Sequence, residues 1–450
     1  MKYHIQTFGC QMNVYDTESL AGLLNRAGHE STDNLDEAEM ILLNTCSIRE
    51  GAEERVRGRA GQLKQYKDIA NLKYLGICGC MAQKEGERLL EKIPYLDLVM
   101  GPGAIGSVSR LVDEVQAGNG PVLDLHGLED DYDEVFPVSN DEVAYPRFVS
   151  VMKGCDKKCT FCVVPFTRGP ERSRAPHIIL QEVENLVKMG HKEVTLIGQT
   201  INAYQWNEID FAQLLKLVDA VPGLERLRFT TSHPKDATAP MLSAMAELPS
   251  LCEQLHLPVQ CGSNRILRRM KRFYTKEDYL DIIHDYRRRF AGAEIPPALT
   301  TDLIVGFPGE TEDDFEMTLD LVREVRYDAA YMFKYSPRRG TAALKLDGQV
   351  DEFTKARRLD ALIKLQNEIA RQLSDAMVGK TVEVMVEQVR QDPKKGAAYE
   401  TRMRTGRIVM LPEEYGPFEI GDILPVKITS ASFFTLYGDP AQKQVKTIVA

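Results

Sequence analysis

Short apolar runs alternate with helical patterns along most of this 450-residue chain, and this alternation limits the possible folds more than any other feature. A strand–helix repeat feeds one parallel strand after another into a sheet. Before residue 126 the apolar runs are YHIQTF, MILLNT, KYLGIC, LDLVM and PVLDL. Helices are predicted from about Thr17, over GAEERVRGRAGQLKQY, after KYLGIC and from Gly103. The first part of the chain is therefore predicted to be an open parallel α/β domain.

An acidic stretch separates this part from a second alternating region. Residues 126–145 carry seven Asp or Glu and no Lys or Arg, which is typical of an exposed linker. Six apolar runs with helical stretches follow: RFVSVMKG, EVTLIGQ, LERLRFTT, CEQLHLPVQ, PALTTDLIVGF and AAYMFKYS. Six strand–helix units predict a (βα)6 barrel, partial or complete.

The pattern changes again from about Ser374, where short strands are separated by Gly, Pro and Asp. Such strands predict a small all-β barrel of OB-like size. The predicted division is an N-terminal α/β domain, an acidic linker, a barrel core and a terminal β domain, at residues 1–125, 126–143, 144–373 and 374–441.

Composition excludes several classes of protein. An apolar fraction of 43% supports several cores and excludes global disorder. No window approaches the roughly 18 to 20 uncharged apolar residues of a membrane span, and the start MKYHIQTFGC lacks a signal-peptide pattern. We therefore expect a cytoplasmic protein. Its net charge of −10 argues against binding polyanions over the whole surface.

Three cysteines, Cys155, Cys159 and Cys162, form a C-x3-C-x2-C run directly after the first strand of the predicted barrel. We call them the barrel triplet. A zinc site normally uses four ligands in paired knuckles, and no fourth Cys or His is near. Three thiolates suit a 4Fe–4S cluster whose fourth iron stays open for a small molecule. The carboxyl end of a barrel strand is also where such folds place chemistry.

A second group, Cys10, Cys46 and Cys80, is spread at intervals of 36 and 34 residues, about one strand–helix unit each. We call it the sheet triplet. Each of its thiols follows a predicted strand, and the carboxyl ends of neighbouring parallel strands line one crevice. The placement predicts a second iron–sulfur cluster, with three unrelated buried cysteines as the alternative. Small buried side chains are expected for the remaining three, Cys78, Cys252 and Cys261. For Cys78 the alternative is a substitute ligand, because on an alternating strand it shares a face with Cys80.

Four motifs surround the two triplets: FGCQMNVYDTE, LLNTCSIREGAEERV, GCMAQ and GCDKKCTFCVVPFTRGPERSR. Over essentially the whole chain they resemble the methylthiotransferase family of radical S-adenosylmethionine (radical SAM) enzymes, in its tRNA-modifying, MiaB-type branch. The sister branch, which modifies a ribosomal-protein aspartate, typically has Pro-Lys where this chain has Gln11 and Met12. Thr200 departs from the family pattern, which often has Asn there, so no role is carried over to it.

The resemblance implies that the barrel triplet holds a 4Fe–4S cluster that cleaves SAM to a 5′-deoxyadenosyl radical. It implies that the sheet triplet holds an auxiliary 4Fe–4S cluster that carries or donates sulfur. All six cysteines would then be catalytic as well as metal ligands. The protein's own part is to supply geometry and to exclude water.

The implied reaction places a methylthio group on the adenine C2 of N6-isopentenyladenosine, next to the tRNA anticodon, at the expense of two SAM. The implied partners are tRNA and a low-potential electron donor such as a flavodoxin or ferredoxin, and the terminal domain resembles the tRNA-binding TRAM module. We expect a monomer. The alternatives are methylthiolation of another hypermodified adenosine or of a ribosomal-protein aspartate, and a non-catalytic RNA-binding protein with structural or redox-sensing clusters.

Polar residues at other predicted strand ends are candidates for binding SAM. Their location supports this role, while a strand-end hydrogen bond or a helix cap is the alternative for each polar one. We expect His233 and His256 to be structural, because radical hydrogen abstraction requires no imidazole base. The predicted SAM-binding residues are Gly198, Gln199, Ser232, Gln260 and Asp302.

Gly101, Gly103 and Gly106 fit G-x-G-x-x-G, with Asp124 near the distance expected for a ribose-binding acid. The motif lies late in its domain, whereas a dinucleotide site uses the first strand–helix turn. A turn that starts a helix is therefore the preferred interpretation.

Basic clusters on this acidic chain are candidates for RNA contact. The candidate runs include RILRRMKR (265–272) and YRRRF (286–290), and a solvated helix face is the preferred interpretation of YRRRF alone. Phe433, Phe434 and Tyr437 either stack on bases or fill the small barrel core. The predicted nucleic-acid-binding residues are Arg390, Lys394, Lys395, Arg402, Arg404 and Arg407.

Overall fold

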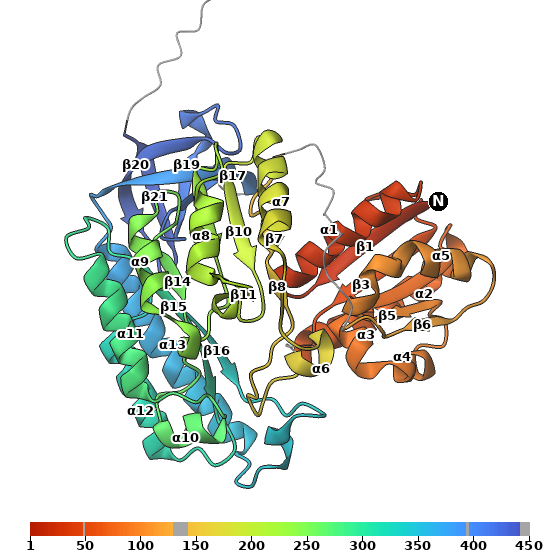
Figure 1. The fold of residues 1–450 in the computed structure, drawn as a ribbon, viewed down its shortest axis with the longest axis horizontal. Coiled ribbons are helices and arrows are strands. Elements are labelled where there is room, and N and C mark those ends of the chain that lie inside the picture. Colours follow the sequence, from red (N-terminus) through yellow and green to blue (C-terminus); the bar gives the residue numbers. More distant parts are fainter. Residues whose placement is uncertain (48–49, 129–142, 393–395, 442–450) are drawn as a thin grey trace, which may run out of the picture.

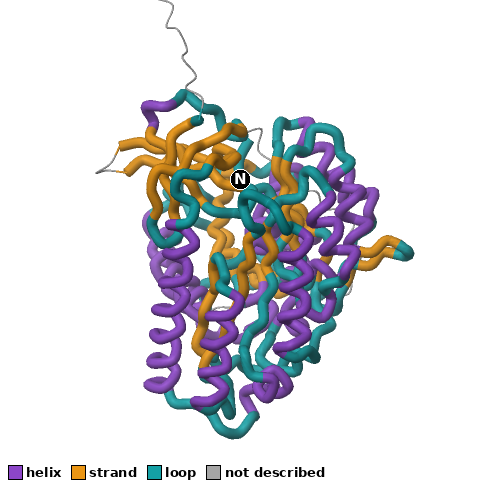
Figure 2. The backbone as a smooth tube through the Cα atoms, turned by 90° about the vertical axis from the view of Figure 1, so that its left-hand side faces the viewer, coloured by secondary structure: helices purple, strands orange, loops and turns teal. Residues whose placement is uncertain are grey.

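The computed structural model describes residues 1–47, 50–128, 143–392 and 396–441. These residues form a parallel sheet with its helices, a central barrel and a small terminal barrel (Figure 1). Figure 2 shows the strands of the terminal barrel gathered at one end of the molecule, with helices of the central unit running lengthwise away from it. Most of the predicted acidic linker, 126–143, lies outside the described residues.

Six parallel strands form the N-terminal sheet, in the order β2-β1-β3-β4-β5-β6. The five predicted strands are confirmed, and the sequence pattern does not reveal β2, which is only two residues long. Their bounds are β1 (Lys2–Phe8), β2 (Glu30–Ser31), β3 (Met40–Thr45), β4 (Tyr74–Gly79), β5 (Leu98–Met100) and β6 (Val122–Asp124). The chain reverses its direction of growth between β1 and β3, and such a switch point opens a crevice at the carboxyl ends of the strands.

Five α-helices connect these strands: α1 (Gln11–Arg26), α2 (Glu50–Ile69), α3 (Cys80–Glu85), α4 (Glu87–Lys92) and α5 (Val108–Gln116). The predicted start of the first helix at Thr17 is wrong, because α1 begins at Gln11. Its early residues look polar in the sequence, yet Met12 and Tyr15 are buried. The helix predicted from Gly103 is also displaced. Residues Pro102–Ser107 form a 3₁₀ helix, η1, and α5 follows it.

The central unit contains the six predicted strands as two parallel three-stranded sheets, β7-β10-β13 and β14-β15-β16. A parallel bridge between Leu227 and Leu251 connects the two sheets. The edge strands of this open (βα)6 barrel are β7 and β16. The bounds are β7 (Phe148–Ser150), β10 (Glu193–Ile197), β13 (Arg226–Phe229), β14 (Gln254–His256), β15 (Ala298–Val305) and β16 (Ala329–Lys334).

Helices cover the outside of this barrel and enclose the largest apolar core of the chain. Asp210, Thr275 and Thr311 cap three of them through side-chain oxygens that accept backbone N–H groups. The helices are α6 (Val164–Arg168), α7 (Pro176–Lys188), α8 (Phe211–Asp219), α9 (Ala239–Glu247), α10 (Asn264–Arg269), α11 (Lys276–Arg289), α12 (Glu312–Val325) and α13 (Glu352–Asp375). The loops contain β8 (Met152–Lys153), β9 (Arg172–Ser173), β11 (Gln205–Trp206), β12 (Ile209–Asp210), η2 (Ile201–Ala203), η3 (Pro234–Asp236) and η4 (Ala342–Lys345).

The terminal strands close into a five-stranded barrel in the order β17-β18-β19-β21-β20, as the sequence predicts. Its elements are β17 (Thr381–Asp392), β18 (Gly396–Met403), β19 (Ile408–Pro412), η5 (Glu413–Tyr415), β20 (Ile423–Ala431) and β21 (Thr435–Pro440). This barrel docks on the amino ends of the central strands. At the start of β13, the Arg226 guanidinium donates to Arg402 O at 2.8 Å, and Arg228 donates to Met403 O at 2.8 Å. The carboxyl ends of the central strands, where α/β barrels place their chemistry, face away from it.

The N-terminal unit docks beside the central barrel, along its edge strand β7 (Figure 1). Met12 and Tyr15 of α1 pack with Phe148 and Ile197 of the barrel in one apolar cluster. This contact turns the carboxyl edge of the N-terminal sheet toward the barrel. Within the described residues, no helix combines the length and apolar character that crossing a membrane requires.

Candidate active site

The sheet triplet lies at the carboxyl edge of three adjacent strands. Cys10 follows β1 and caps α1, Cys46 follows β3, and Cys80 opens α3 directly after β4. The first two thiols flank the β1/β3 switch point, and their side chains are hydrogen-bonded to each other. The sequence predicts that these three thiols converge, and the structure brings them together at one edge. Cys78, a residue of β4, is instead buried in the apolar core that β4 shares with α1 and α5.

A buried arginine from the central unit reaches into this group. Arg168, at the end of α6, donates from Nε to Cys80 Sγ at 3.1 Å and from Nη2 to Asp16 Oδ2 at 2.6 Å. A hydrogen bond from Cys46 lowers the pKa of Cys10 to about 6, and the charge of Arg168 acts in the same direction. Burial raises the pKa of Cys80, and Arg168 opposes that shift. The surroundings therefore favour the thiolate of Cys10, and at Cys80 the charge of Arg168 partly offsets the effect of burial.

The barrel triplet lies in the loop between β8 and α6. The Cys155 thiol is 3.2 Å from Thr200 Oγ1, and Val164 N lies 3.5 Å from Cys162 Sγ. Burial raises the pKa of Cys155, and it raises the pKa of Cys162 to about 12. Thr200, whose role the sequence left open, therefore contacts a predicted ligand.

Arg272 is the buried arginine of this second group. It donates from Nη1 to Cys159 Sγ at 3.3 Å, from Nη2 to Pro258 O at 2.9 Å and from Nε to Tyr274 OH at 3.0 Å. Within the described residues no carboxylate forms an ion pair with it, although it is only 5% exposed. A buried cation requires a counter-charge. Thiolate ligands of a cluster supply one, so this site fits an iron–sulfur cluster.

The expectation that RILRRMKR offers surface cations for RNA is wrong for Arg272, which is buried beside Cys159. In the same segment Arg265 pairs with Asp314, and Arg269 pairs with Asp347. Within the described residues, no three His, Cys, Asp or Glu side chains meet closely enough to hold a single metal ion. Ligands of a 4Fe–4S cluster bind different iron atoms and do not have to meet at one point.

Four of the predicted SAM-binding residues follow the carboxyl ends of β10, β13 and β14, whereas Asp302 lies within β15. Several have unusual surroundings. Gln199 Oε1 and Ser232 Oγ are buried without a hydrogen-bond partner, which a polar ligand would correct. Gln260 has φ +73°, and its N–H donates to Asp302 O at 2.9 Å. A Cβ on Gly198 would lie 2.6 Å from Met152 Cγ, so this position accepts only glycine without movement.

Thr231, which the sequence does not single out, has φ +74° between two of these positions. Left-handed backbone is a genuine outlier for a β-branched residue, and such strain concentrates at functional sites. The two histidines have structural contacts, as expected. Burial lowers the pKa of His233 to about 2, and its Nδ1 accepts from Lys235 N at 3.1 Å. The His256 ring lies 2.9 Å from Thr300 Oγ1.

The G-x-G-x-x-G segment packs against other parts of its own domain. A Cβ on Gly101 would lie 1.9 Å from Gln83 Oε1, and one on Gly103 would lie 2.5 Å from the backbone of Gly127. Asp124 pairs with Arg110 at 3.0 Å. These contacts account for the glycines and the acid, in agreement with the preferred interpretation as a turn.

The predicted RNA-binding residues divide into two sets. Arg390 is exposed and pairs with Glu400 across the strands, while Lys394 and Lys395 lie outside the described residues. The other three arginines stabilise the fold: Arg402 pairs with Glu387, Arg404 with Glu253 of the central unit, and Arg407 with Asp328 of the central unit.

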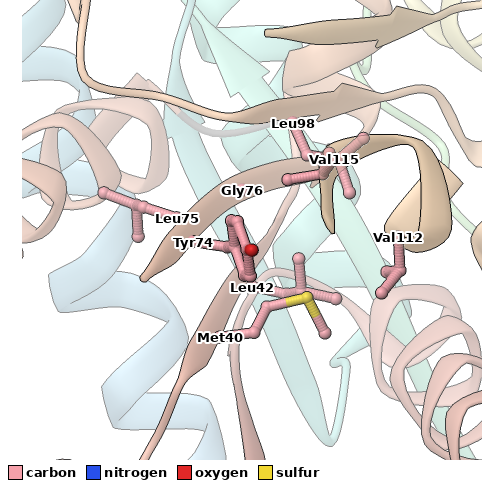
Figure 3. A pocket seen from close by; sticks show the side chains of 8 residues that line it. All are labelled: Met40, Leu42, Tyr74, Leu75, Gly76, Leu98, Val112 and Val115. Carbon is pink, nitrogen blue, oxygen red and sulfur yellow. The ribbon is translucent and has the colours of Figure 1, made fainter. Parts of the chain in front are cut away.

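A small apolar hollow lies at the opposite end of the N-terminal sheet. Met40 and Tyr74, the first residues of β3 and β4, line it together with Val112 and Val115 of α5 (Figure 3). The sheet triplet follows the other ends of the same strands. The hollow is therefore a packing feature remote from the thiols.

Comparisons with known proteins agree with this architecture. The chain matches the family models "Uncharacterized protein family UPF0004" over residues 2–101, "Radical SAM superfamily" over 149–322 and "TRAM domain" over 375–441. The fold resembles the radical SAM methyltransferase TsrM of Kitasatospora setae, solved with cobalamin and a [4Fe-4S] cluster, with a TM-score of 0.56, 13% identity and 74% of each chain covered. The chain is thus a radical SAM enzyme.

Curated relatives define the particular family. A "tRNA-2-methylthio-N(6)-dimethylallyladenosine synthase" of Thermoanaerobacter sp. (strain X514) is 44% identical, covering 97% of this chain and 92% of the relative. Proteins of the same name from Sulfurihydrogenibium sp. and Aquifex aeolicus are 42% and 40% identical, with 97% of this chain covered in each case. The chain belongs to the tRNA-2-methylthio-N(6)-dimethylallyladenosine synthase family.

The strain at Thr231 predicts an unusual effect of glycine on stability. Thr231→Gly should raise the free energy of unfolding by roughly 1 kcal/mol, because glycine adopts the left-handed backbone without a steric cost. The neighbouring Thr230, whose φ is negative, supplies the matched control. Thr230→Gly should lower the free energy of unfolding by a similar amount. Urea denaturation measures both, and equal destabilisation by the two changes would show that Thr231 is not strained.

Proposed function

We propose that this enzyme adds a methylthio group to the adenine C2 of N6-isopentenyladenosine next to the tRNA anticodon. The observation that supports this most directly is the position of two cysteine triplets on facing edges of two docked domains, connected by Arg168. The names of relatives at 40–44% identity support the same substrate. We also propose the domain division at 1–125, 126–143, 144–373 and 374–441.

In this proposal each triplet holds one 4Fe–4S cluster, with SAM at the open iron of the barrel cluster. The clusters and SAM supply one-electron cleavage of a carbon–sulfur bond and a sulfur atom for transfer. The protein binds and orients these groups. Arg272 would neutralise the thiolate of Cys159, and the burial of Cys155 keeps water from that ligand.

The strand-end residues provide the polar contacts for SAM in this proposal. Gln199 Oε1 would accept a hydrogen bond from the cofactor, and the Ser232 hydroxyl would accept one or donate one. Gln260 is held in a left-handed conformation, which fixes the direction of its side chain. Gly198 leaves room where a side chain would collide with Met152, and Asp302 on β15 is a half-buried acceptor beside His256.

We further propose that a low-potential donor such as a flavodoxin or ferredoxin docks beside Cys159. Lys158, Lys235 and Lys271 are exposed there around the exposed ring of Phe273. Arg272 lies between two of these residues and contacts the Cys159 sulfur. A basic and aromatic surface complements the acidic surface of such donors. In this proposal the enzyme works as a monomer in the cytoplasm.

For tRNA, the terminal barrel offers Arg390 with the neighbouring Lys394 and Lys395. Phe433 and Phe434 are 49% and 51% exposed, and Tyr437 is 37% exposed. These exposures favour base stacking over filling of the barrel core. The interface role of Arg404 and Arg407 leaves them outside the proposed RNA contacts.

The reaction is tested with anaerobically reconstituted enzyme, SAM, a reductant and tRNA that carries or lacks the isopentenyl group. Mass spectrometry of digested tRNA should show the 2-methylthio nucleoside only with the isopentenylated tRNA. Alanine at the three sheet-triplet positions should leave SAM cleavage to 5′-deoxyadenosine intact and abolish this product. Alanine at the three barrel-triplet positions should abolish both and remove about half of the bound iron. Product formed without the sheet triplet, or a ribosomal protein modified in preference to tRNA, would contradict the proposal.

The RNA contact predicts a change in salt dependence. Replacing Arg390, Lys394 and Lys395 together by Gln should weaken tRNA binding and flatten the slope of log K against log salt. The expected change is about 0.7 to 0.9 for each phosphate that the variant no longer neutralises. Arg323→Gln, an exposed arginine on α12, serves as the control and should keep the slope. An unchanged slope in the triple variant would place the phosphate contacts elsewhere.

A further inference from the structure

Arg168 connects the two halves of the site through a hydrogen bond to Cys80 and an ion pair with Asp16. It follows Cys162 of the barrel triplet by six residues, and its side chain contacts Cys80 of the sheet triplet. The residue is only 6% exposed. Arg168 is therefore close in sequence to the barrel triplet, and its side chain is hydrogen-bonded to a sulfur atom of the sheet triplet.

The backbone around Arg168 leaves little freedom for this side chain. Helix α6 starts directly after the barrel triplet, with Pro165 in its first turn. Gly169 then turns the chain with φ +76°, and a Cβ there would lie 2.9 Å from Leu128 O. Any other residue at position 169 would be strained and crowded. The position of the guanidinium is thus fixed from both sides.

The guanidinium of Arg168 has two hydrogen-bond acceptors, the carboxylate of Asp16 and the sulfur of Cys80. Asp16, itself 5% exposed, accepts from Nη2 at 2.6 Å and neutralises the guanidinium in this dry environment. Nε remains to donate to the Cys80 sulfur. Hydrogen bonds to ligand sulfur atoms are one means by which proteins set the reduction potential of iron–sulfur clusters.

We propose that Arg168 is a positioning residue that holds the Cys80 ligand of the auxiliary cluster in place against the barrel cluster and raises its reduction potential. Asp16 orients the guanidinium for this contact. The inference rests on the proposed function, because it requires a cluster on the sheet triplet. In this inference a residue of the central unit, Arg168, helps to set the position and the reduction potential of the cluster in the N-terminal unit.

A second ion pair across the same interface supplies the matched control. Arg147, next to β7, donates to Glu18 Oε1 of α1 at 2.8 Å, and its exposed fraction of 8% is close to that of Arg168. No hydrogen bond from Arg147 to a thiol occurs among the described residues. Arg147→Gln therefore removes an interdomain ion pair without touching the proposed cluster environment.

The experiment measures the auxiliary cluster alone, in full-length protein whose barrel triplet is replaced by alanine. Arg168→Gln should shift its midpoint potential to more negative values, because the sulfur loses a charged donor. Arg168→Lys should give an intermediate shift, and Arg147→Gln should leave the potential unchanged. With the barrel triplet intact, Arg168→Gln should lower the methylthio product formed per 5′-deoxyadenosine about 10- to 100-fold, the usual effect of removing a partner of a metal ligand.

The outcomes separate this inference from the function on which it rests. A wild-type protein without a second cluster would refute the proposed function. If the wild-type protein holds both clusters, only the role of Arg168 is at stake. That role would be refuted if Arg168→Gln left unchanged both the midpoint potential and the methylthio product formed per 5′-deoxyadenosine. If Arg168→Gln does not fold, Asp16→Asn carries the test. It leaves the guanidinium beside Cys80 without its counter-charge and should shift the potential to more positive values, whereas an unchanged potential would overturn the inference.

Discussion

The packing of α1 along β7 is the interaction on which the candidate active site depends. An open barrel exposes an edge strand, and natural proteins cover such edges. Here Met12 and Tyr15 cover the edge, and the same helix begins at Cys10. Covering the barrel edge therefore also fixes the distance between the sheet triplet and the barrel. A separate linker or a flexible hinge at this place would not provide that alignment.

The terminal barrel is held by a comparable set of buried charges at the opposite end of the central strands. Arg226 and Arg228 lie inside the barrel and donate to backbone carbonyls of β18 and the turn after it. At the amino end of the central barrel, these arginines therefore form hydrogen bonds across the boundary with the terminal barrel. The carboxyl end keeps unpaired polar atoms such as Ser232 Oγ. The terminal barrel thus covers the amino ends of the central strands, and their carboxyl ends stay available for chemistry.

Periodicity in the sequence predicts most strands and the convergence of the sheet triplet, because parallel strands bring equivalent positions to one edge. The barrel triplet is evident from its local spacing alone. It does not predict the start of α1 at Gln11, since the tertiary contact that buries Met12 and Tyr15 is absent from a local pattern. The roles of Arg168 and Arg272 cannot be predicted from the sequence for a related reason. In the sequence they look like ordinary basic residues, and only the fold reveals that they are buried beside sulfur. A basic residue within a few positions of a cysteine motif is the available signal.

In the proposed enzyme, the interface between the N-terminal unit and the central barrel holds two clusters side by side. The path from Cys162 through α6 and the Arg168 side chain to Cys80 limits their separation to about 20 Å, given the rise of an α-helix and the reach of an arginine. Pulsed electron paramagnetic resonance of the reduced holoenzyme measures the magnetic interaction between them. We expect two paramagnetic clusters that are coupled at a distance within that limit. A single cluster, or two clusters without measurable coupling, would contradict it.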